Sequence, residues 1–431
     1  MELKLKNIGK LNKADIKIDG ITIIAGKNNT GKSTVGKALY CIFSSLYDVD
    51  KKIEEDRKDY IRREIAILFR KDSFFIYRIF NENYKDIVEK IIKKIVDRDF
   101  YEAKKQVLFI FQDIKDKSNQ LSGLKKFKIP NDDDIDNVFN NIEEALKIPN
   151  KYFYMHRLEN IFNEEFNGQI NNVNTDLKSS IELIIKNKKI NLCVEDDIFQ
   201  PNTYMDLESD VVYIDSPFVL DNIEDIDCDD LLSHKCNVIN KLIENIKDNN
   251  MTADIIFQEK LTLLIKKLDD IGVGKLIQDN EVFNNQFKYQ SKYDKKPIEI
   301  TNISAGLKTF IILKTLILNG HIQEKGCIIL DEPEIHLHPE WQLVFAELIV
   351  LLQKTFNLHI LLNTHSPYFL RAIQVYSAKY EISDRCNYYL AENALENNIA
   401  TIRDVSDNTN EIYKLLYYPF QQLDDEPYYE N

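Results

Sequence analysis

Side chains that can bind a metal or move a proton gather in one short stretch, CIILDEPEIHLHPEW, at residues 327–341. Three of its carboxylates and both of its histidines lie within a few positions: Asp331, Glu332, Glu334, His336 and His338. Such groups are common metal ligands and also the usual general acids and bases. On an extended segment the two histidines would point to the same side, so a zinc site is one candidate. The alternative is a contribution to a larger site that other parts of the chain complete.

A glycine-rich segment near the amino terminus, GKNNTGKST, has the spacing of a phosphate-binding loop. It matches GxxxxGK[ST], follows the apolar residues ITIIA and precedes a predicted helix, which is the context that such a loop requires. Its glycines let backbone amides turn inward around an anion, and the helix amino terminus adds positive potential. Lys32 is expected to reach the β- and γ-phosphates, and the Ser33 hydroxyl to bind Mg²⁺. The predicted nucleotide-binding residues of this loop are Gly26, Asn28, Asn29, Thr30, Gly31, Lys32, Ser33 and Thr34.

The phosphate-binding loop changes the interpretation of the acidic stretch. CIIL predicts a buried strand, and Asp331 ends it, as the Mg²⁺-binding aspartate of a Walker B motif does. Asp331 would then bind the ion together with Ser33, and Glu332 would orient and deprotonate the attacking water. The alternative without a catalytic role is a solvated Asp-Glu pair at a strand end. Glu334, His336 and His338 would then follow the site, where either packing within the chain or contact with another subunit is expected of them.

Two further segments occur in the order that a nucleotide site requires. NTHSP follows the predicted strand HILL and places His365 where an imidazole can contact the γ-phosphate, although a strand-end histidine can also be structural. ISAGLKT opens a predicted helix before the acidic stretch, so Ser304 and Gly306 could bind a phosphate at the helix amino terminus. In isolation, Ser-x-Gly is an ordinary helix cap.

Composition and charge limit the class of protein. A length of 431 residues fits one large or two modest domains, and 44% hydrophobic with 29% charged residues is typical of a soluble globular chain. The net charge of −14 provides no general positive surface for nucleic acid. The six cysteines include no CxxC pair, which predicts reduced thiols rather than a disulfide or zinc framework. With neither a membrane-spanning apolar run nor a secretory signal in the sequence, a cytoplasmic protein without a membrane partner is expected.

Strand–helix–strand patterns at both ends predict an α/β core that a helical insertion divides. The predicted segments are the first part of the core (1–50), the helical insertion (51–170), core strands with a helical subdomain (171–300), the second part of the core (301–385) and a closing segment with an acidic tail (386–431). Helices are predicted in the core at 33–47, 225–270, 307–319 and 339–354. The acidic, tyrosine-rich tail is either disordered or a docking segment for a partner.

Local signals refine this organisation. Asp19-Gly20 predicts a hairpin between ADIKI and ITIIA, and SIELIIKNKKINLCV predicts a second hairpin that turns at Asn187–Lys188. In the insertion, an apolar stripe at helical spacing predicts a packed helix bundle, with a partner-binding arm as the alternative. The residues of this stripe are Ile87, Val88, Ile91, Ile92, Ile95 and Val96. No heptad pattern persists long enough for a coiled-coil arm.

In this order, the phosphate-binding loop, the signature-like ISAGLKT, LDEPEIHLHP and NTHSP resemble ABC-type ATPases of the SMC/RecF/OLD branch. The last two segments resemble the AAA-type subgroup found in OLD-family proteins and in the ATPase subunits of the anti-phage systems Septu and PARIS. The resemblance implies an α/β ABC-type head with a mixed-sheet core, ATP with Mg²⁺, and a homodimer or higher oligomer. In it, Ser304 and Gly306 of one subunit would act on ATP held by another.

The chain departs from that family in two places. Its signature is ISAGLK rather than the LSGGQ form, and no glutamine of a Q-loop is obvious. Gln169, in EFNGQI, and the turn at Ser216 are two candidates for that position. The residues after His365 also lack the Asp-x-Asp pattern of a TOPRIM nuclease, so any cleavage is expected from a partner chain.

Three functions compete on this basis. The first is an ATPase that senses or regulates in anti-phage defence and controls a separate effector, a nuclease or toxin. The second is a RecF-like repair or recombination ATPase that clamps DNA directly. The third, the nucleotide-binding subunit of a membrane transporter, is disfavoured by the degenerate signature and the large insertion.

Overall fold

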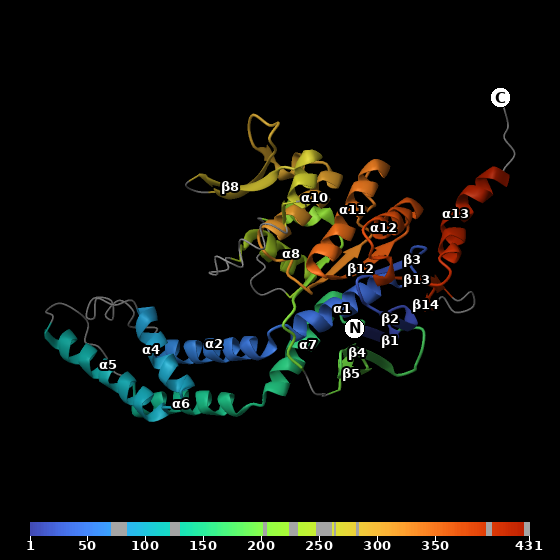
Figure 1. Ribbon diagram of the computed structural model, residues 1–431. Helices are drawn as coiled ribbons and strands as arrows, with labels where there is room; N and C mark the ends of the chain where they lie inside the picture. Colours follow the sequence, from blue (N-terminus) through green and yellow to red (C-terminus); the bar gives the residue numbers. More distant parts are fainter. Residues whose placement is uncertain are drawn as a thin grey trace. The chain divides into compact units, whose positions relative to one another are not determined.

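The computed structural model describes residues 1–69, 84–120, 130–200, 205–223, 232–246, 261–262, 264–281, 284–393 and 399–425 (Figure 1). The chain forms two compact units. The core unit comprises Met1–Tyr47 with Met155–Asn431, and the helical unit comprises Asp48–Tyr154. The last six residues of the predicted acidic tail, Cys228 and parts of the predicted helix at 225–270 lie outside the described residues.

The core unit is built on one large mixed sheet. Its first strands and helix are β1 (Glu2–Ile8), β2 (Leu11–Lys17), β3 (Ile21–Gly26) and α1 (Lys32–Leu46). The middle of the chain adds β4 (Ser179–Ile185), β5 (Lys188–Glu195), β6 (Ile198–Phe199), β7 (Val211–Ile214), the 3-10 helix η1 (Pro217–Asn222) and α8 (His234–Ile243). The last part adds α10 (Ala305–Leu318), β11 (Cys327–Asp331), α11 (Pro339–Phe356), β12 (His359–Thr364), α12 (Pro367–Lys379), β13 (Cys386–Asn393), β14 (Ala400–Asp404) and α13 (Asn410–Asp425). A separate three-stranded sheet contains β8 (Lys275–Glu281), β9 (Asn284–Gln290) and β10 (Ile298–Glu299).

Within the described part of the chain the large sheet has eleven strands in the order β6-β5-β4-β1-β2-β14-β13-β3-β12-β11-β7. One half is parallel, since β3 pairs in parallel with β12 and β13, and β11 pairs in parallel with β12 and β7. The other half is an antiparallel meander of β1, β2, β4, β5 and β6. The predicted α/β fold with a mixed sheet is confirmed.

Helices bury both faces of the parallel half, which explains why its strands are continuous apolar runs. On one face, residues of α8, α10, α11 and α12 share a core with alternate residues of β3, β7, β11 and β12. On the other face α1 approaches closely, because a Cβ on Gly36 would lie 3.1 Å from the Ile329 side chain. Helices therefore cover both faces of the sheet at β3, the strand that the phosphate-binding loop follows.

The predicted hairpin at Asp19-Gly20 is wrong. β2 pairs with β1 and β14, whereas β3 pairs with β12 and β13, so the turn joins strands that are not neighbours. The physical reason is burial, because every residue of β3 is buried and the strand therefore belongs in the parallel centre of the sheet. The hairpin of β4 and β5 does form, but it turns at Lys186–Asn187, one residue earlier than predicted.

The helical unit has a core of its own. Its helices are α2 (Val49–Phe69), α4 (Tyr84–Val96), α5 (Phe100–Gln120), α6 (Asp132–Lys147) and the first turn of α7 (Asn150–Phe166). The predicted stripe on α4 lies in this core except for Val96, which is 38% exposed near the end of the helix. α7 runs on from this unit into the core unit, where it ends at Phe166.

Candidate active site

The predicted site residues follow neighbouring parallel strands of the large sheet. The register pairs Ala25 of β3 with Thr364 of β12, and Asn363 of β12 with Asp331 of β11. Parallel strands end at the same edge of a sheet, and ligands of open α/β sheets bind in the crevice there. The glycine-rich loop after β3, the acidic pair at the end of β11 and the histidine after β12 therefore lie together.

Backbone geometry fixes the phosphate-binding loop. Gly31 precedes α1 with φ +80°, and a Cβ at this position would lie 2.6 Å from Cδ2 of Leu11, so only glycine fits. The side chain of Lys32 is buried and folds back over its own loop. Its Nζ donates hydrogen bonds to the carbonyl oxygens of Gly26 at 3.0 Å and Lys27 at 2.9 Å.

A cleft of ≈ 400 Å³ opens in front of this loop. Its lining residues are Lys10, Asn28, Asn29, Thr30, Gly31, Lys32, Ser33, Thr34, Asp215, Asp331, Glu332 and Ile335. Every predicted loop residue from Asn28 to Thr34 thus shares one cleft with both predicted carboxylates. Gly26 ends β3 beneath the loop, where a Cβ would lie 2.5 Å from the carbonyl oxygen of Ala391.

The Asp331 carboxylate is held by a hydrogen bond to each of its oxygens. Oδ1 accepts from the Asn363 side-chain amide at 2.9 Å, and Oδ2 accepts from the Tyr213 hydroxyl at 3.1 Å. Asn363 is fully buried and Tyr213 is 1% exposed, so neither donor can easily turn away. Groups of this kind orient a metal ligand from behind. Sequence reasoning missed both, although a polar residue inside the apolar strand HILLNT was a visible signal.

Glu332 lies between the side chains of Lys32 and His365. Its backbone has φ +49°, and its N–H donates to the carbonyl oxygen of Asn363 at 3.0 Å. One carboxylate oxygen, Oε1, lies 3.2 Å from Nζ of Lys32. The other, Oε2, lies 3.3 Å from Nδ1 of His365. The structure therefore brings the predicted general base, the predicted phosphate-binding lysine and the predicted sensor histidine into direct contact.

This contact shifts the pKa of both Glu332 and His365. The hydrogen bond with His365 lowers the pKa of Glu332, with Lys32 adding to the effect, and together they outweigh burial. The same hydrogen bond raises the pKa of His365 against the opposing effect of burial. Glu332 is consequently ionised at neutral pH, as a group that accepts a proton from water must be.

Of the two roles expected for Glu334, packing and subunit contact, the structure shows packing. It is 2% exposed, and its Oε1 accepts hydrogen bonds from the Thr364 hydroxyl and, at 3.1 Å, from the His365 backbone N–H. Burial raises the pKa of this carboxyl group. Glu334 thus holds the segment that carries His365 and does not face another subunit.

The two histidines of the acidic stretch lie in a turn and at a helix cap rather than on an extended segment. The His336 ring packs edge-on against Phe218, with ring centroids 5.2 Å apart. His338 precedes α11, and its Nδ1 accepts a hydrogen bond from the Glu340 N–H at 3.4 Å. Since no group of three or more potential ligands gathers anywhere in the described residues, the structure does not support the zinc alternative.

The signature-like residues lie outside the cleft of their own chain. Ser304 is exposed and caps α10, where its hydroxyl accepts from the Leu307 N–H at 3.4 Å. Gly306 is buried, and a Cβ there would lie 2.8 Å from the carbonyl oxygen of His336. The glycine is therefore needed within the chain, because it lets α10 pack against the turn that follows Asp331 and Glu332.

Neither predicted Q-loop candidate lines the cleft. Gln169 is exposed in the turn after α7, and the Ser216 hydroxyl caps η1 by accepting from the Phe218 N–H at 3.3 Å. The residue that does line the cleft is Asp215, which directly follows β7. Sequence reasoning missed it, although a carboxylate straight after the apolar VVYI is the same signal that identified Asp331.

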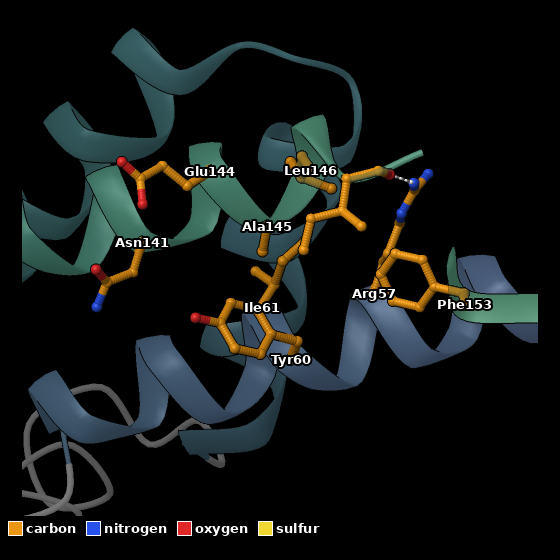
Figure 2. Close-up of a pocket in the computed structure, with 9 residues that line it drawn as sticks. Arg57, Tyr60, Ile61, Asn141, Glu144, Ala145, Leu146 and Phe153 are labelled. Atoms are coloured by element: carbon orange, nitrogen blue, oxygen red, sulfur yellow. Dashed lines mark hydrogen bonds between the residues drawn. The ribbon is translucent and has the colours of Figure 1, made fainter. Parts of the chain in front are cut away.

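A second hollow, of ≈ 480 Å³, lies within the helical unit (Figure 2). It is lined by Arg57, Tyr60, Ile61, Asn141, Glu144, Ala145, Leu146, Ile148 and Phe153. Arg57 bonds the carbonyl oxygen of Ile148 at 2.6 Å and lies over the Phe153 ring, 5.1 Å from its centroid. These contacts fix the α2–α6 packing and form no catalytic arrangement.

The AAA ATPase domain family matches residues 1–370, which include the loop, the acidic pair and the histidine. The chain belongs to this family. Its match confirms the prediction of a P-loop ATPase. The closer resemblance to the Septu and PARIS subunits stays a prediction. None of the described helices of this AAA ATPase domain is both long and apolar enough to cross a membrane.

Individual similarities are distant. The "Retron Vc95 probable ATPase" of Vibrio cholerae serotype O1 biovar El Tor is 27% identical over 157 residues, which is 32% of this chain and 28% of that protein. An SMC head bound to the C-winged helix domain of ScpA has 12% identity and a TM-score of 0.41, covering 95% of this chain and 98% of that chain. The SMC head domain from Thermotoga maritima has 10% identity and a TM-score of 0.37, covering 94% and 98%.

Proposed function

We propose that the cleft binds ATP with Mg²⁺ and that Glu332 activates the water that attacks the γ-phosphate. The observation that carries this proposal is the position of the Glu332 carboxylate, which contacts Lys32 and His365 at the edge of the phosphate-binding loop. The family membership supports nucleotide binding at the same place. A carboxylate held ionised beside a phosphate site is the arrangement that a general base requires.

The donors in the cleft fit Mg²⁺, which prefers oxygen ligands. The Ser33 hydroxyl and the Asp331 carboxylate would hold the ion, and both residues line the cleft. When bound, Mg²⁺ would neutralise charge on the β- and γ-phosphates. Lys32 would exchange its present carbonyl contacts for phosphate oxygens, and the loop amides would surround the phosphates.

Lys32→Ala tests the binding step. The variant should lose ATP binding, measured by titration with a fluorescent ATP analogue. The reason is that Lys32, where the loop meets α1, is the lysine expected to bind the β- and γ-phosphates. Lys10 also lines the cleft and provides the matched control: Lys10→Ala should keep measurable binding. Unchanged affinity in Lys32→Ala would show that nucleotide binds elsewhere.

The proposal also includes a second copy of the chain. Ser304 is exposed at the start of α10 and does not line the cleft of its own chain, so it is free to contact nucleotide held by a partner. A phosphate at a helix amino terminus would meet free N–H groups there. The oligomer would then contain composite sites, each with the loop of one subunit and the α10 start of another.

The cellular role that we propose is a sensor or regulator in bacterial anti-phage defence that controls a separate nuclease or toxin. The similarity to a retron ATPase supports this role. Co-purification with the product of the neighbouring gene, with and without ATP, tests it. ATP-dependent capture would support a dedicated effector, and its absence would count against one.

A RecF-like ATPase that clamps DNA is the second candidate. The net charge of −14 disfavours it, because affinity for duplex DNA comes largely from neutralised phosphates. Binding of the isolated protein to duplex DNA that needs ATP and weakens steeply with salt would favour this alternative.

A further inference from the structure

Asp215 adds a third carboxylate to the cleft, beside Asp331 and Glu332. It follows β7, the edge strand next to β11, and its side chain is 28% exposed. Because Asp215 lines the cleft, the orientation of its carboxylate bears on the proposed site. The contacts of Asp215 show what holds it.

His234, the first residue of α8, bridges Asp215 to a buried glutamate. Its Nε2 lies 3.1 Å from Oδ2 of Asp215, and its Nδ1 lies 2.8 and 2.9 Å from the two carboxylate oxygens of Glu165. Each imidazole nitrogen therefore faces a carboxylate: Nδ1 is hydrogen-bonded to Glu165, and Nε2 lies at ion-pair distance from Asp215. His234 is 5% exposed and Glu165 is 4% exposed.

Aromatic rings keep the His234 imidazole in place. It stacks on Tyr213, with centroids 4.3 Å apart and planes at 29°, and meets the edge of Tyr40 at 5.9 Å. Tyr213 is the residue whose hydroxyl holds Asp331. The same ring therefore supports one cleft carboxylate by its hydroxyl group and another through the stacked histidine.

Glu165 is itself anchored on several sides. Besides the imidazole, its carboxylate accepts from the His234 backbone N–H at 2.7 Å, and its carbonyl oxygen accepts from Nζ of Lys37 at 2.7 Å. Lys37 lies on α1, the helix that follows the phosphate-binding loop. Glu165 occupies the last turn of α7, the helix by which the chain returns from the helical unit.

We propose that His234 is a positioning residue of the ATPase site, which fixes the Asp215 carboxylate in the cleft by tying it to Glu165 at the end of α7. This inference rests on the proposed hydrolysis of ATP in the same cleft. A purely structural ion pair would stabilise the fold equally well, so the test must separate an effect on Asp215 from an effect on stability.

A double-mutant cycle makes that separation, because coupled residues give non-additive effects. His234→Ala should lower kcat for ATP by about tenfold to 100-fold, by analogy with residues that orient a metal ligand, with little change in KM. In the Asp215→Asn background the same substitution should have almost no further effect on kcat. An effect of His234→Ala that is equally large in both backgrounds, or an unchanged kcat, would overturn the proposal.

Glu165→Gln provides a second variant if His234→Ala does not fold, since it keeps the size of the side chain and an acceptor for the His234 N–H. It should lower kcat in the wild-type background and lose that effect beside Asp215→Asn. His359→Ala, at the opposite end of β12 from the cleft, is the matched control and should leave kcat unchanged. Glu332→Gln in the same assay keeps the two proposals apart. If Glu332→Gln hydrolyses ATP at the normal rate, the proposed catalytic site is wrong and the His234 proposal falls with it. If Glu332→Gln is inactive and the double-mutant cycle shows no coupling, only the His234 proposal is wrong.

Discussion

The Glu332 carboxylate and the His365 imidazole are in direct contact, with Oε2 3.3 Å from Nδ1. The two residues come from separate strands, since Glu332 follows β11 and His365 follows β12. Their pairing depends on Glu334, which holds the His365 backbone, and on the Asn363 carbonyl oxygen, which holds the Glu332 backbone. A γ-phosphate bound beside this pair would therefore affect both the proposed base and the histidine.

Glu332→Gln should abolish hydrolysis and preserve ATP binding. The amide keeps the shape of the side chain but does not accept the proton of water, and loss of a general base costs about 100-fold to 10,000-fold in rate. Binding should persist because Lys32 loses a competing carboxylate contact and remains available to phosphate. Phosphate release and binding of a fluorescent ATP analogue measure the two steps.

The control for this experiment is Glu340→Gln, in the first turn of α11, whose side chain is 86% exposed. It changes charge by the same amount and should hydrolyse ATP at the normal rate. If Glu332→Gln turns over as fast as this control, Glu332 is not the base.

The contact also predicts how stability depends on pH. The pKa of folded His365 is raised above its ordinary value of 6.5 by the hydrogen bond to Glu332, so the folded state binds the proton more tightly than the unfolded state. The stabilisation is therefore fully present below the unfolded pKa and is lost as pH rises through the higher folded pKa. His365→Gln should lower the melting temperature most at about pH 6 and least at about pH 9.

Thermal melts of wild type and His365→Gln across this range measure the difference directly. His338→Gln is the control, because His338 is 70% exposed and caps α11 instead of pairing with Glu332. A difference between wild type and His365→Gln that grows with pH would contradict the assigned sign.

Tyr213→Phe should weaken the response to Mg²⁺. The substitution removes the hydroxyl that donates to Oδ2 of Asp331 and leaves the Asn363 bond to Oδ1 intact. Loss of such an orienting group typically costs about tenfold to 100-fold in metal affinity or activity. The Mg²⁺ concentration for half-maximal ATPase activity should rise accordingly.

Tyr389→Phe is a suitable control for this loss of a buried hydroxyl. Tyr389 is 2% exposed on β13, and its hydroxyl accepts from the Lys17 N–H at 2.9 Å, within the sheet and not at Asp331. Its Mg²⁺ response should match wild type. An equal shift in both variants would mean that lost stability, rather than the orientation of Asp331, explains the result.

The sequence predicted which residues meet at the cleft better than it predicted the residues that hold them. Lys32 belongs to a glycine-rich loop between a strand and a helix, and Asp331, Glu332 and His365 lie at or just after the ends of apolar strands. Both local patterns can be recognised without knowing the fold. Tyr213 and Asn363 act on Asp331 from other strands, and His234 acts on Asp215 from a helix. Their partners depend on the strand order of the sheet, which no local pattern contains.

The error at Asp19-Gly20 has the same origin. A local turn signal suggests that the flanking strands pair, but both neighbours of β3 come from the last quarter of the chain, β12 and β13. Gly306 shows what a motif leaves out. Its role at nucleotide stays a prediction, and the close approach of the His336 carbonyl oxygen gives it a packing role within the chain that the motif did not indicate.

Composite sites predict recovery of activity when two inactive variants are mixed. Lys32→Ala lacks a working phosphate-binding loop but keeps the start of α10, and Ser304→Arg keeps the loop but obstructs the start of α10. Ser304 is exposed, so the arginine should be accommodated in the fold, although loss of the cap would cost about 0.5–2 kcal/mol of stability. Each variant alone should be inactive, and a mixture should regain part of the wild-type activity through mixed oligomers.

Steady-state hydrolysis as a function of the mixing ratio measures this recovery. The control carries both substitutions, Lys32→Ala and Ser304→Arg, in one chain and should give no recovery when mixed with either single variant. A mixture as inactive as its components, or a Ser304→Arg variant that is active alone, would show that each cleft works without a second subunit.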